Sequence, residues 1–290
     1  MPTLPGPSQS ENTYFIDAEN AAEMARLTNQ DRLVTKSMGG LFPERLDLTH
    51  IHDILDIGCG PGGWILDVAR EYPEKQVVGI DISTLMVEYA RYQAYIQGLN
   101  NISFRVMNAL EPLDFRDSSF DMVNVRFISG FMPPVVWSRL MQECLRIMRP
   151  GGVVRLTEPE YPLSNSLMVE KLGALLTKAM QVAGQSFSPD GRHAGMTPML
   201  GRFLRDAGCQ DIQKAAYVLD SSMGTEEHLS QYQNTMVFLK LVQPFIIKME
   251  LITQEEVDQL YQRALTEMMS DDYCSLWYFL SAWGVKPQQV

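Results

Sequence analysis

The chain is organised around one stretch, Ile54-Leu55-Asp56-Ile57-Gly58-Cys59-Gly60-Pro61-Gly62-Gly63-Trp64. Its first half is an apolar run that predicts a buried parallel strand, and its second half opens a helix. The glycine-rich turn between them lets backbone N–H groups approach a ligand where a Cβ atom would collide. Gly58, Gly60 and Gly63 fit the dinucleotide-binding pattern G-x-G-x-x-G. The pattern D-x-G-x-G-x-G, which begins at Asp56, fits equally well, so the stretch alone does not choose between them.

Four segments farther along the chain make that choice. A second apolar run ends at Asp81, about 20 residues after the first glycine, where an acid can bind both ribose hydroxyls of an adenosine. The other three are Met107-Asn108-Ala109, Phe120-Asp121-Met122-Val123 and Leu145-Arg146-Ile147-Met148-Arg149-Pro150-Gly151-Gly152. In this order and spacing, the five segments resemble the class I S-adenosylmethionine (SAM)-dependent methyltransferases. The resemblance covers residues 50–220 and the last strand.

The resemblance implies an α/β fold with a doubly wound, seven-stranded, mostly parallel sheet, an antiparallel last strand and helical cap insertions. It implies SAM as the cofactor and S-adenosylhomocysteine as its product. Ligands of such sheets lie outside the carboxyl ends of the strands. In this family an acid at the position of Asp56 lies near the methionine end of the cofactor, and the end of the third strand contacts adenine. The expected cofactor-binding residues are Asp56, Gly58, Cys59, Gly60, Gly62, Asp81, Ile82, Met86, Asn108, Ala109, Leu110, Val125 and Arg126.

The alternation of strand and helix patterns from Asp53 onward also predicts a parallel sheet with helices on both faces. Strands are expected near residues 52–57, 76–81, 102–107, 121–126, 152–158, 211–219 and 273–283. Helices are expected near residues 62–71, 84–97, 134–147 and 164–183. Ser83 is the expected N-cap of the second of these helices, and Thr253 with Glu256 forms the pattern of a capping box.

We divide the chain into four parts. Residues 1–42 form an N-terminal tail, over residues 1–12, and an amphipathic lid helix, over residues 18–35. Residues 43–222 form the SAM-binding core, which has an insertion at 160–197. Residues 223–272 form a cap of two helices over the mouth of the active site, and residues 273–290 return to the core as its last strand. The alternative role of the cap is dimerisation, which would make the protein a homodimer.

Three residues are candidates for the base that a hydroxyl acceptor would need, and such a base contributes roughly 10²–10⁴-fold to the rate. His193 lies in a loop of the insertion, where the alternative is a solvated surface histidine. Glu158 ends the fifth strand, where the alternatives are binding substrate or ordering a loop. Glu160 is a third candidate. The expected substrate-binding residues are Tyr14, Met132, Glu158, Tyr161 and His193, with core packing as the alternative role of Tyr14 and Met132.

Composition excludes several classes of protein. The formal net charge of −11 argues against a nucleic-acid substrate, since nucleic-acid binding usually leaves a basic footprint. There is no apolar run of about 18 residues and no signal-peptide pattern, so we expect no membrane span. The four cysteines lack metal-ligand spacing and indicate reduced thiols in a cytoplasmic protein. We also expect no metal, because Arg126 stands where metal-dependent catechol-type members of the family place an acid.

The sequence therefore predicts an enzyme that transfers a methyl group from SAM to a small, partly apolar molecule by in-line displacement, as in quinone or secondary-metabolite biosynthesis. Two alternatives remain from other functional classes. One is a nicotinamide-dependent oxidoreductase, because the glycine patterns overlap. The other is a regulator that binds SAM without transferring its methyl group.

Overall fold

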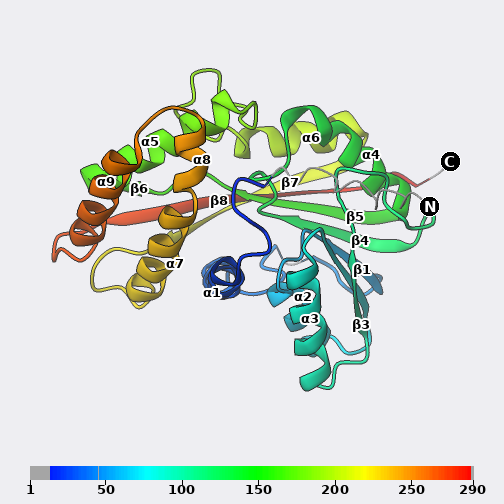
Figure 1. Ribbon diagram of the computed structural model, residues 1–290. Helices are drawn as coiled ribbons and strands as arrows, with labels where there is room; N and C mark the ends of the chain where they lie inside the picture. The colour runs from blue at the N-terminus through cyan, green and yellow to red at the C-terminus, as the bar shows by residue number, and fades with distance from the viewer. Residues whose placement is uncertain (1–13, 45, 289–290) are drawn as a thin grey trace, which may run out of the picture.

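The structure is a computed structural model and describes residues 14–44 and 46–288. The expected tail over residues 1–12 lies outside this range. Figure 1 shows one sheet running through the molecule, with helices above and below it. Its strands are β1 (Asp53–Ile57), β2 (Gln76–Asp81), β3 (Ile102–Val106), β4 (Phe120–Arg126), β5 (Met148–Pro159), β6 (Leu163–Ser164), β7 (Gln210–Asp220) and β8 (Ser275–Val285).

The strand order confirms the predicted doubly wound sheet. Within the described residues the order is β3-β2-β1-β4-β5-β8-β6, and β7 also pairs with β8. Strands β1 to β5 pair in parallel, and β8 runs antiparallel to both β5 and β7. The order reverses between β1 and β4, so the carboxyl ends of these two strands border the crevice where ligands of such sheets bind. The short strand β6 was not predicted, because two residues carry no readable pattern.

Helices cover both faces of the sheet, as the alternating pattern predicted (Figure 1). On one face α2 (Gly63–Glu71) and α3 (Thr84–Ile96) pack on β1 and β2 through Ile54, Ile65 and Val87. On the other face lie η1 (Pro134–Val136), α4 (Trp137–Ile147), η2 (Thr197–Met199) and α6 (Leu200–Ala207). The predicted cap of α3 is confirmed, since the Ser83 hydroxyl accepts the Met86 N–H at 3.1 Å.

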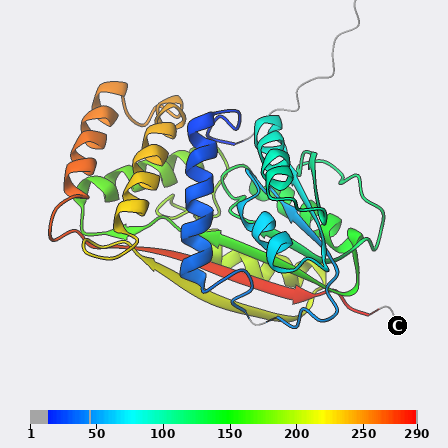
Figure 2. The same ribbon diagram turned by 90° about the horizontal axis from the view of Figure 1, so that it is seen from below.

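The helix predicted over residues 18–35 is present as α1 (Ala21–Met38), three residues later than expected. It starts there because the Asn20 side chain accepts the N–H of Ala22 at 2.8 Å. It ends at Gly39, whose φ of 93° is left-handed. Figure 2 shows α1 standing between the helical cap and the helices α2 and α3, so one helix contributes to both halves of the molecule.

The predicted cap, residues 223–272, contains α7 (His228–Leu241), α8 (Gln243–Lys248) and α9 (Gln254–Glu267). Helix α5 (Leu167–Val182), from the insertion at 160–197, packs against α9. We predicted two helices between residues 225 and 270, but the structure has three. Pro244 separates α7 from α8, because proline has no N–H for the helical ladder and its ring crowds the preceding turn. The predicted capping box is confirmed: Thr253 and Glu256 exchange hydrogen bonds at the start of α9.

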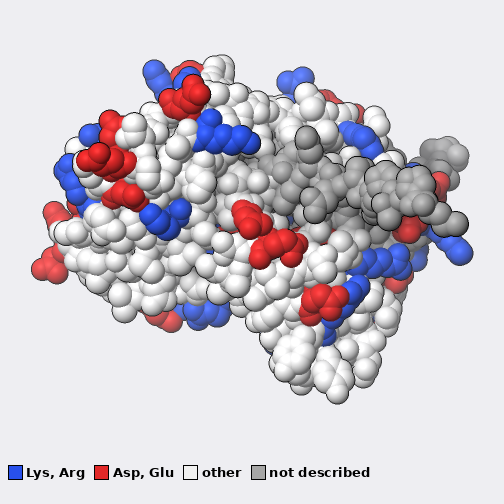
Figure 3. Space-filling view, in the orientation of Figure 1, with Lys and Arg blue, Asp and Glu red and all other residues white. Residues whose placement is uncertain are grey.

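Two further properties bear on what the protein can contact. No helix within residues 14–44 and 46–288 is long and apolar enough to cross a membrane. On the face seen in Figure 3, basic and acidic side chains are interspersed, and the described part of that face has no broad basic patch.

Candidate active site

The glycine-rich turn between β1 and α2 forms the floor of a cavity. Gly58, Gly60 and Gly62 have φ values of 70°, 53° and 85°, a left-handed conformation that glycine adopts without strain. A Cβ atom on Gly60 would point into open space, with its nearest neighbour, Leu27 Cδ1, 3.8 Å away. A Cβ atom on Gly62 would instead lie 3.0 Å from Ala90 Cβ, inside the packing of α3. Gly60 thus keeps the cavity open, and Gly62 lets the turn pack on the core.

The structure brings most of the expected cofactor-binding residues together around this cavity, which measures about 1110 Å³ with its open mouth. Eleven of the thirteen line it: Asp56, Gly58, Cys59, Gly60, Asp81, Ile82, Met86, Asn108, Ala109, Leu110 and Arg126. Gly62 and Val125 do not line it. Gly62 faces α3, and Val125 is fully buried because its side chain points into the core beneath α4.

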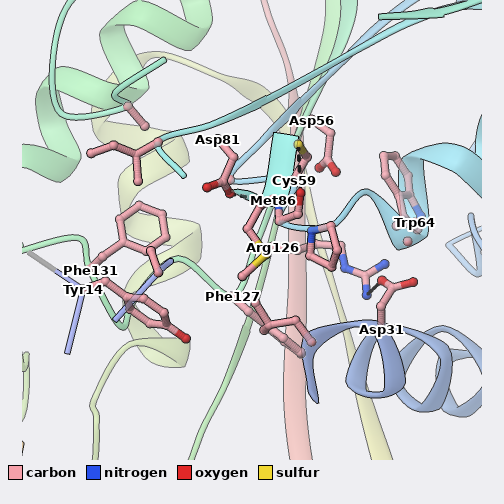
Figure 4. Close-up of a pocket in the computed structure, with 18 of the residues that line it drawn as sticks. Tyr14, Asp31, Asp56, Cys59, Trp64, Asp81, Met86, Arg126, Phe127 and Phe131 are labelled. Atoms are coloured by element: carbon pink, nitrogen blue, oxygen red, sulfur yellow. Dashed lines mark hydrogen bonds and ion pairs between the residues drawn. The ribbon is translucent and has the colours of Figure 1, made fainter. Parts of the chain in front are cut away.

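Asp81 holds the turn while facing the cavity (Figure 4). Its Oδ2 accepts the Gly60 N–H at 2.9 Å, and its Oδ1 accepts the Ser83 N–H at 2.9 Å. Burial raises the pKa of the Asp81 carboxyl, and the N–H groups of Ser83 and Gly60 oppose that rise. A carboxylate has about four lone-pair directions, so Asp81 keeps acceptor capacity for ligand hydroxyls after these two bonds.

A second polar group lies where β1 and β4 pair in parallel. The Asn124 side-chain amide donates to Asp56 Oδ1 at 2.7 Å. Burial raises the pKa of Asp56 to about 7, against the opposing effects of the Asn124 hydrogen bond and the Arg126 charge. Arg126 in turn pairs with Asp31 of α1, at 3.0 Å between Nη2 and Oδ1 (Figure 4). The sequence analysis did not identify Asp31 as a site residue, because no local pattern predicts a contact between residues 95 positions apart.

A second cavity, of about 1170 Å³ with its mouth, lies between the core and the cap. Its walls come from the residues before α1, from α1, α5, α7 and β8, and from the segment after β5. They include Phe15, Tyr161, Phe238 and Trp277. The two cavities share lining residues, namely Tyr14, Leu27, Gln30 and Phe127. They are therefore adjacent, with residues from α1 and the end of β4 between them.

One wall of the second cavity is a buried polar network that the sequence did not reveal. Glu23 and Arg26 of α1 are 0% and 5% exposed, and their side chains pair at 2.7 Å. The Tyr14 hydroxyl donates to Glu23 Oε1 at 2.7 Å. Arg26 also donates to Asn234 Oδ1 of α7 at 3.1 Å, which ties the lid helix to the cap. The sequence signal that could have indicated this ion pair is a Glu and an Arg three residues apart on the otherwise apolar face of α1.

Of the expected substrate-binding residues, Tyr14 lines both cavities and Tyr161 lines the second. Met132 lines neither. It is fully buried in the core, and the Trp137 indole N–H donates to its carbonyl oxygen at 3.2 Å. The turn after β4 directs this side chain toward α4 rather than toward the cap, which agrees with the alternative role of core packing.

The two expected catalytic residues are also not brought to the cavities. The side chain of His193 is exposed, while the adjacent Ala194 lines the second cavity. Glu158 is fully buried and accepts the N–H groups of Ile128 at 2.8 Å and Ser129 at 3.3 Å. Burial raises the pKa of Glu158 to about 7, and these hydrogen bonds oppose the rise. In this structure the His193 side chain lies at the surface, and the Glu158 carboxylate holds the loop after β4.

Glu160 does line the second cavity, but its carboxylate holds the insertion loop. It accepts the N–H groups of Ala194, Gly195 and Thr197 at 3.0 to 3.3 Å. Within the described residues, no group of three or more His, Cys, Asp or Glu side chains could hold a metal ion.

Comparison with known proteins gives three findings. A family model described as a methyltransferase domain matches residues 54–152. The nocamycin O-methyltransferase of Saccharothrix syringae is 34% identical over 209 residues, which cover 66% of this chain and 72% of that protein. The demethylmenaquinone methyltransferase of Lactococcus lactis is 33% identical over 117 residues, 40% of this chain and 45% of that protein. The chain spans about half the length of several such curated relatives.

Among solved structures, the phosphoethanolamine N-methyltransferase 2 of Haemonchus contortus, in complex with SAM, matches with a TM-score of 0.52. The alignment covers 94% of this chain and 60% of that chain at 19% identity. At this identity the likeness concerns the fold, and it agrees with the strand order described above.

Proposed function

Because this chain belongs to the SAM-dependent methyltransferases, we propose that it transfers a methyl group from SAM to a small, partly apolar molecule. The observation that carries the proposal is the pair of adjacent cavities. One is lined by the glycine turn and Asp81, and the other by aromatic side chains under the cap. A methyl donor in the first and an acceptor in the second would meet beside Tyr14, Leu27, Gln30 and Phe127.

The residues of the first cavity fit the cofactor. Gly60 leaves open the space that a Cβ atom would fill, and the half-buried Asp81 carboxylate faces the same space as an acceptor for ribose hydroxyls. Asp56, in its ionised form, would hold the ammonium of the methionine end. When bound, SAM supplies a methyl group on a sulfonium, which a nucleophile displaces in line.

The contribution of the protein is to align donor and acceptor and to exclude water. Alignment can supply on the order of 7–11 kcal/mol of the barrier. The cap and α1 enclose the second cavity, and Tyr14 closes against Phe131 with ring centroids 6.1 Å apart. Relatives named as acting in O-methylation of nocamycin and in methylation of demethylmenaquinone support an apolar, quinone-like or secondary-metabolite acceptor.

Two assays test the proposal. Calorimetry should detect S-adenosylhomocysteine binding and no NADH binding, which would remove the nicotinamide-dependent alternative. Incubation with methyl-labelled SAM and a panel of hydroxylated quinols should then release S-adenosylhomocysteine together with a methylated product. A protein that binds S-adenosylhomocysteine but methylates no member of a broad panel would support the regulator instead.

We propose further that the protein is cytoplasmic and does not act on nucleic acid. The net charge of −11 supports the second statement, and the four cysteines, all free thiols, support the first. If the cap instead mediates dimerisation, the protein is a homodimer, and sedimentation velocity would test this alternative.

A further inference from the structure

His228, the first residue of α7, has an unusual environment in the second cavity. The residue is 4% exposed and lines the cavity. Its Nδ1 lies 3.0 Å from the carbonyl oxygen of Ser221. Its Nε2 is buried and has no hydrogen-bond partner among the described residues. A buried polar atom without a partner is unfavourable and calls for an explanation.

The neighbouring polar side chains of this cavity are already satisfied. Asn234 donates to Gln231 Oε1 at 3.2 Å and accepts from Arg26 at 3.1 Å. Gln231 donates to the Thr235 hydroxyl at 3.3 Å. Of the described residues that line this cavity, His228 is the one whose buried side-chain nitrogen or oxygen lacks a partner. The missing partner is therefore to be sought in the cavity itself.

The contact with Ser221 decides what that partner must be. A carbonyl oxygen only accepts hydrogen bonds, so Nδ1 must carry the hydrogen. In the neutral imidazole, Nε2 then presents a lone pair. It can satisfy that lone pair only with a donor, such as a hydroxyl or an N–H group.

The charges in the cavity wall favour a neutral donor. Arg26 is neutralised by Glu23 at 2.7 Å, and the Glu160 carboxylate is occupied by backbone N–H groups. Arg26 is thus ion-paired, and the four hydrogen bonds that the Glu160 carboxylate accepts occupy both of its oxygens, so no charged side chain among the described lining residues is left to bind an ammonium or a carboxylate directly. The remaining walls are aromatic, from Phe15, Tyr161, Phe238 and Trp277, and aromatic faces stack well on flat rings.

We infer that His228 Nε2 accepts a hydrogen bond from a hydroxyl group of the methyl acceptor, and that this acceptor is a neutral, flat, hydroxylated aromatic molecule. The inference rests on the proposed function, since it assigns the second cavity to the acceptor. His228 is in this view a substrate-binding residue that sets the orientation of the ring system between the aromatic walls.

The test compares 2-naphthol with naphthalene, two probes that differ by one hydroxyl. Binding is measured by equilibrium dialysis in the presence of saturating S-adenosylhomocysteine. The wild-type protein should bind 2-naphthol about tenfold more tightly than naphthalene. His228→Leu should remove the preference, because leucine has no acceptor. His228→Gln should keep most of it, since the glutamine amide oxygen can accept the same hydrogen bond.

Gln243→Leu is the matched control. Gln243 is also a cap residue, 2% exposed, with an unpartnered side-chain nitrogen, but it lines neither cavity. This variant should keep the preference for 2-naphthol. His228→Met gives a second apolar replacement if the leucine variant does not fold.

Two outcomes would overturn the inference. One is an unchanged preference for 2-naphthol in the folded apolar variants of His228. The other is no binding of either probe to the wild-type protein. The affinity for S-adenosylhomocysteine is measured separately: its absence would overturn the proposed function, while the preference for 2-naphthol and its loss in His228→Leu would still decide the role of His228.

Discussion

The Asp81 carboxylate accepts N–H groups of the glycine turn and also faces the first cavity, which we assign to the cofactor. Asp81→Ala should weaken S-adenosylhomocysteine binding by about 1–3 kcal/mol, or about 5- to 150-fold, since buried ribose hydroxyls would lose a charged acceptor. Calorimetry measures the loss. Asp81→Asn is the comparison, because its amide oxygen can still accept one N–H of the turn. An unchanged affinity in both folded variants would contradict the ribose assignment.

Asp56 should make cofactor binding depend on pH. Its pKa of about 7 means that the carboxyl is protonated below that pH in the free protein. An ammonium ligand favours the ionised form, so binding below pH 7 must release a proton. Affinity for S-adenosylhomocysteine should fall about tenfold per pH unit below 7 and level off above it.

Calorimetry in buffers of different ionisation enthalpy measures this proton release, which should be about one proton at pH 6 and close to zero at pH 8. Asp56→Asn should abolish it. If the release persists in Asp56→Asn, another group titrates, and Asp31, whose pKa burial also raises, is the first to examine.

At the scale of the element, two glycines of the turn have different roles: Gly62 packs against the core, and Gly60 leaves space for a ligand. Gly60→Ala should reduce S-adenosylhomocysteine affinity more than tenfold, because the new methyl group would occupy cofactor space and meets no protein atom closer than 3.8 Å. Gly98→Ala is the matched control. Gly98 has a similar φ of 67° with no atom near its Cβ position, so it reports the backbone strain alone.

Thermal unfolding should show a similar loss of stability for the two glycine variants, while calorimetry should show reduced affinity for Gly60→Ala alone. Equal affinities would mean that the cofactor does not approach the turn at Gly60.

At the scale of the whole molecule, the cap should serve the acceptor and not the cofactor. The cofactor cavity is lined by the core and α1, and no residue of the described segment 223–272 lines it. The two ends of that segment are adjacent, since the Met223 N–H donates to the Tyr273 carbonyl oxygen at 2.8 Å. A short linker can therefore replace residues 224–271 without pulling the sheet apart.

This deletion should spare S-adenosylhomocysteine affinity and remove methyl transfer, because the second cavity would lose a wall and admit water. Calorimetry and labelled-methyl assays measure the two effects, and circular dichroism checks that the core folds. Normal methyl transfer would make the cap an element of stability or dimerisation. Loss of cofactor binding in a folded variant would assign the cap to the cofactor site.

The sequence by itself determined the elements whose signals are local. The apolar runs of β1 and β2 predicted their bounds to within a residue, because a buried parallel strand is apolar along its whole length. The hydrogen bonds of Ser83 and of Thr253 with Glu256 close within one helical turn, so these caps could be read from residues three apart. The glycine spacing and Asp81 then predicted the side of the sheet at which the first cavity lies.

Only the tertiary structure decided which side chains reach the cavities. Met132 and His193 stand close in sequence to cavity residues, yet one is packed under α4 and the other is exposed. Arg26 with Asn234, and Arg126 with Asp31, join residues far apart in the chain. The burial of His228 likewise requires α7 and the strands β7 and β8 to come together. The physical reason is that these positions result from packing between distant segments, which leaves no periodic signal within any one of them.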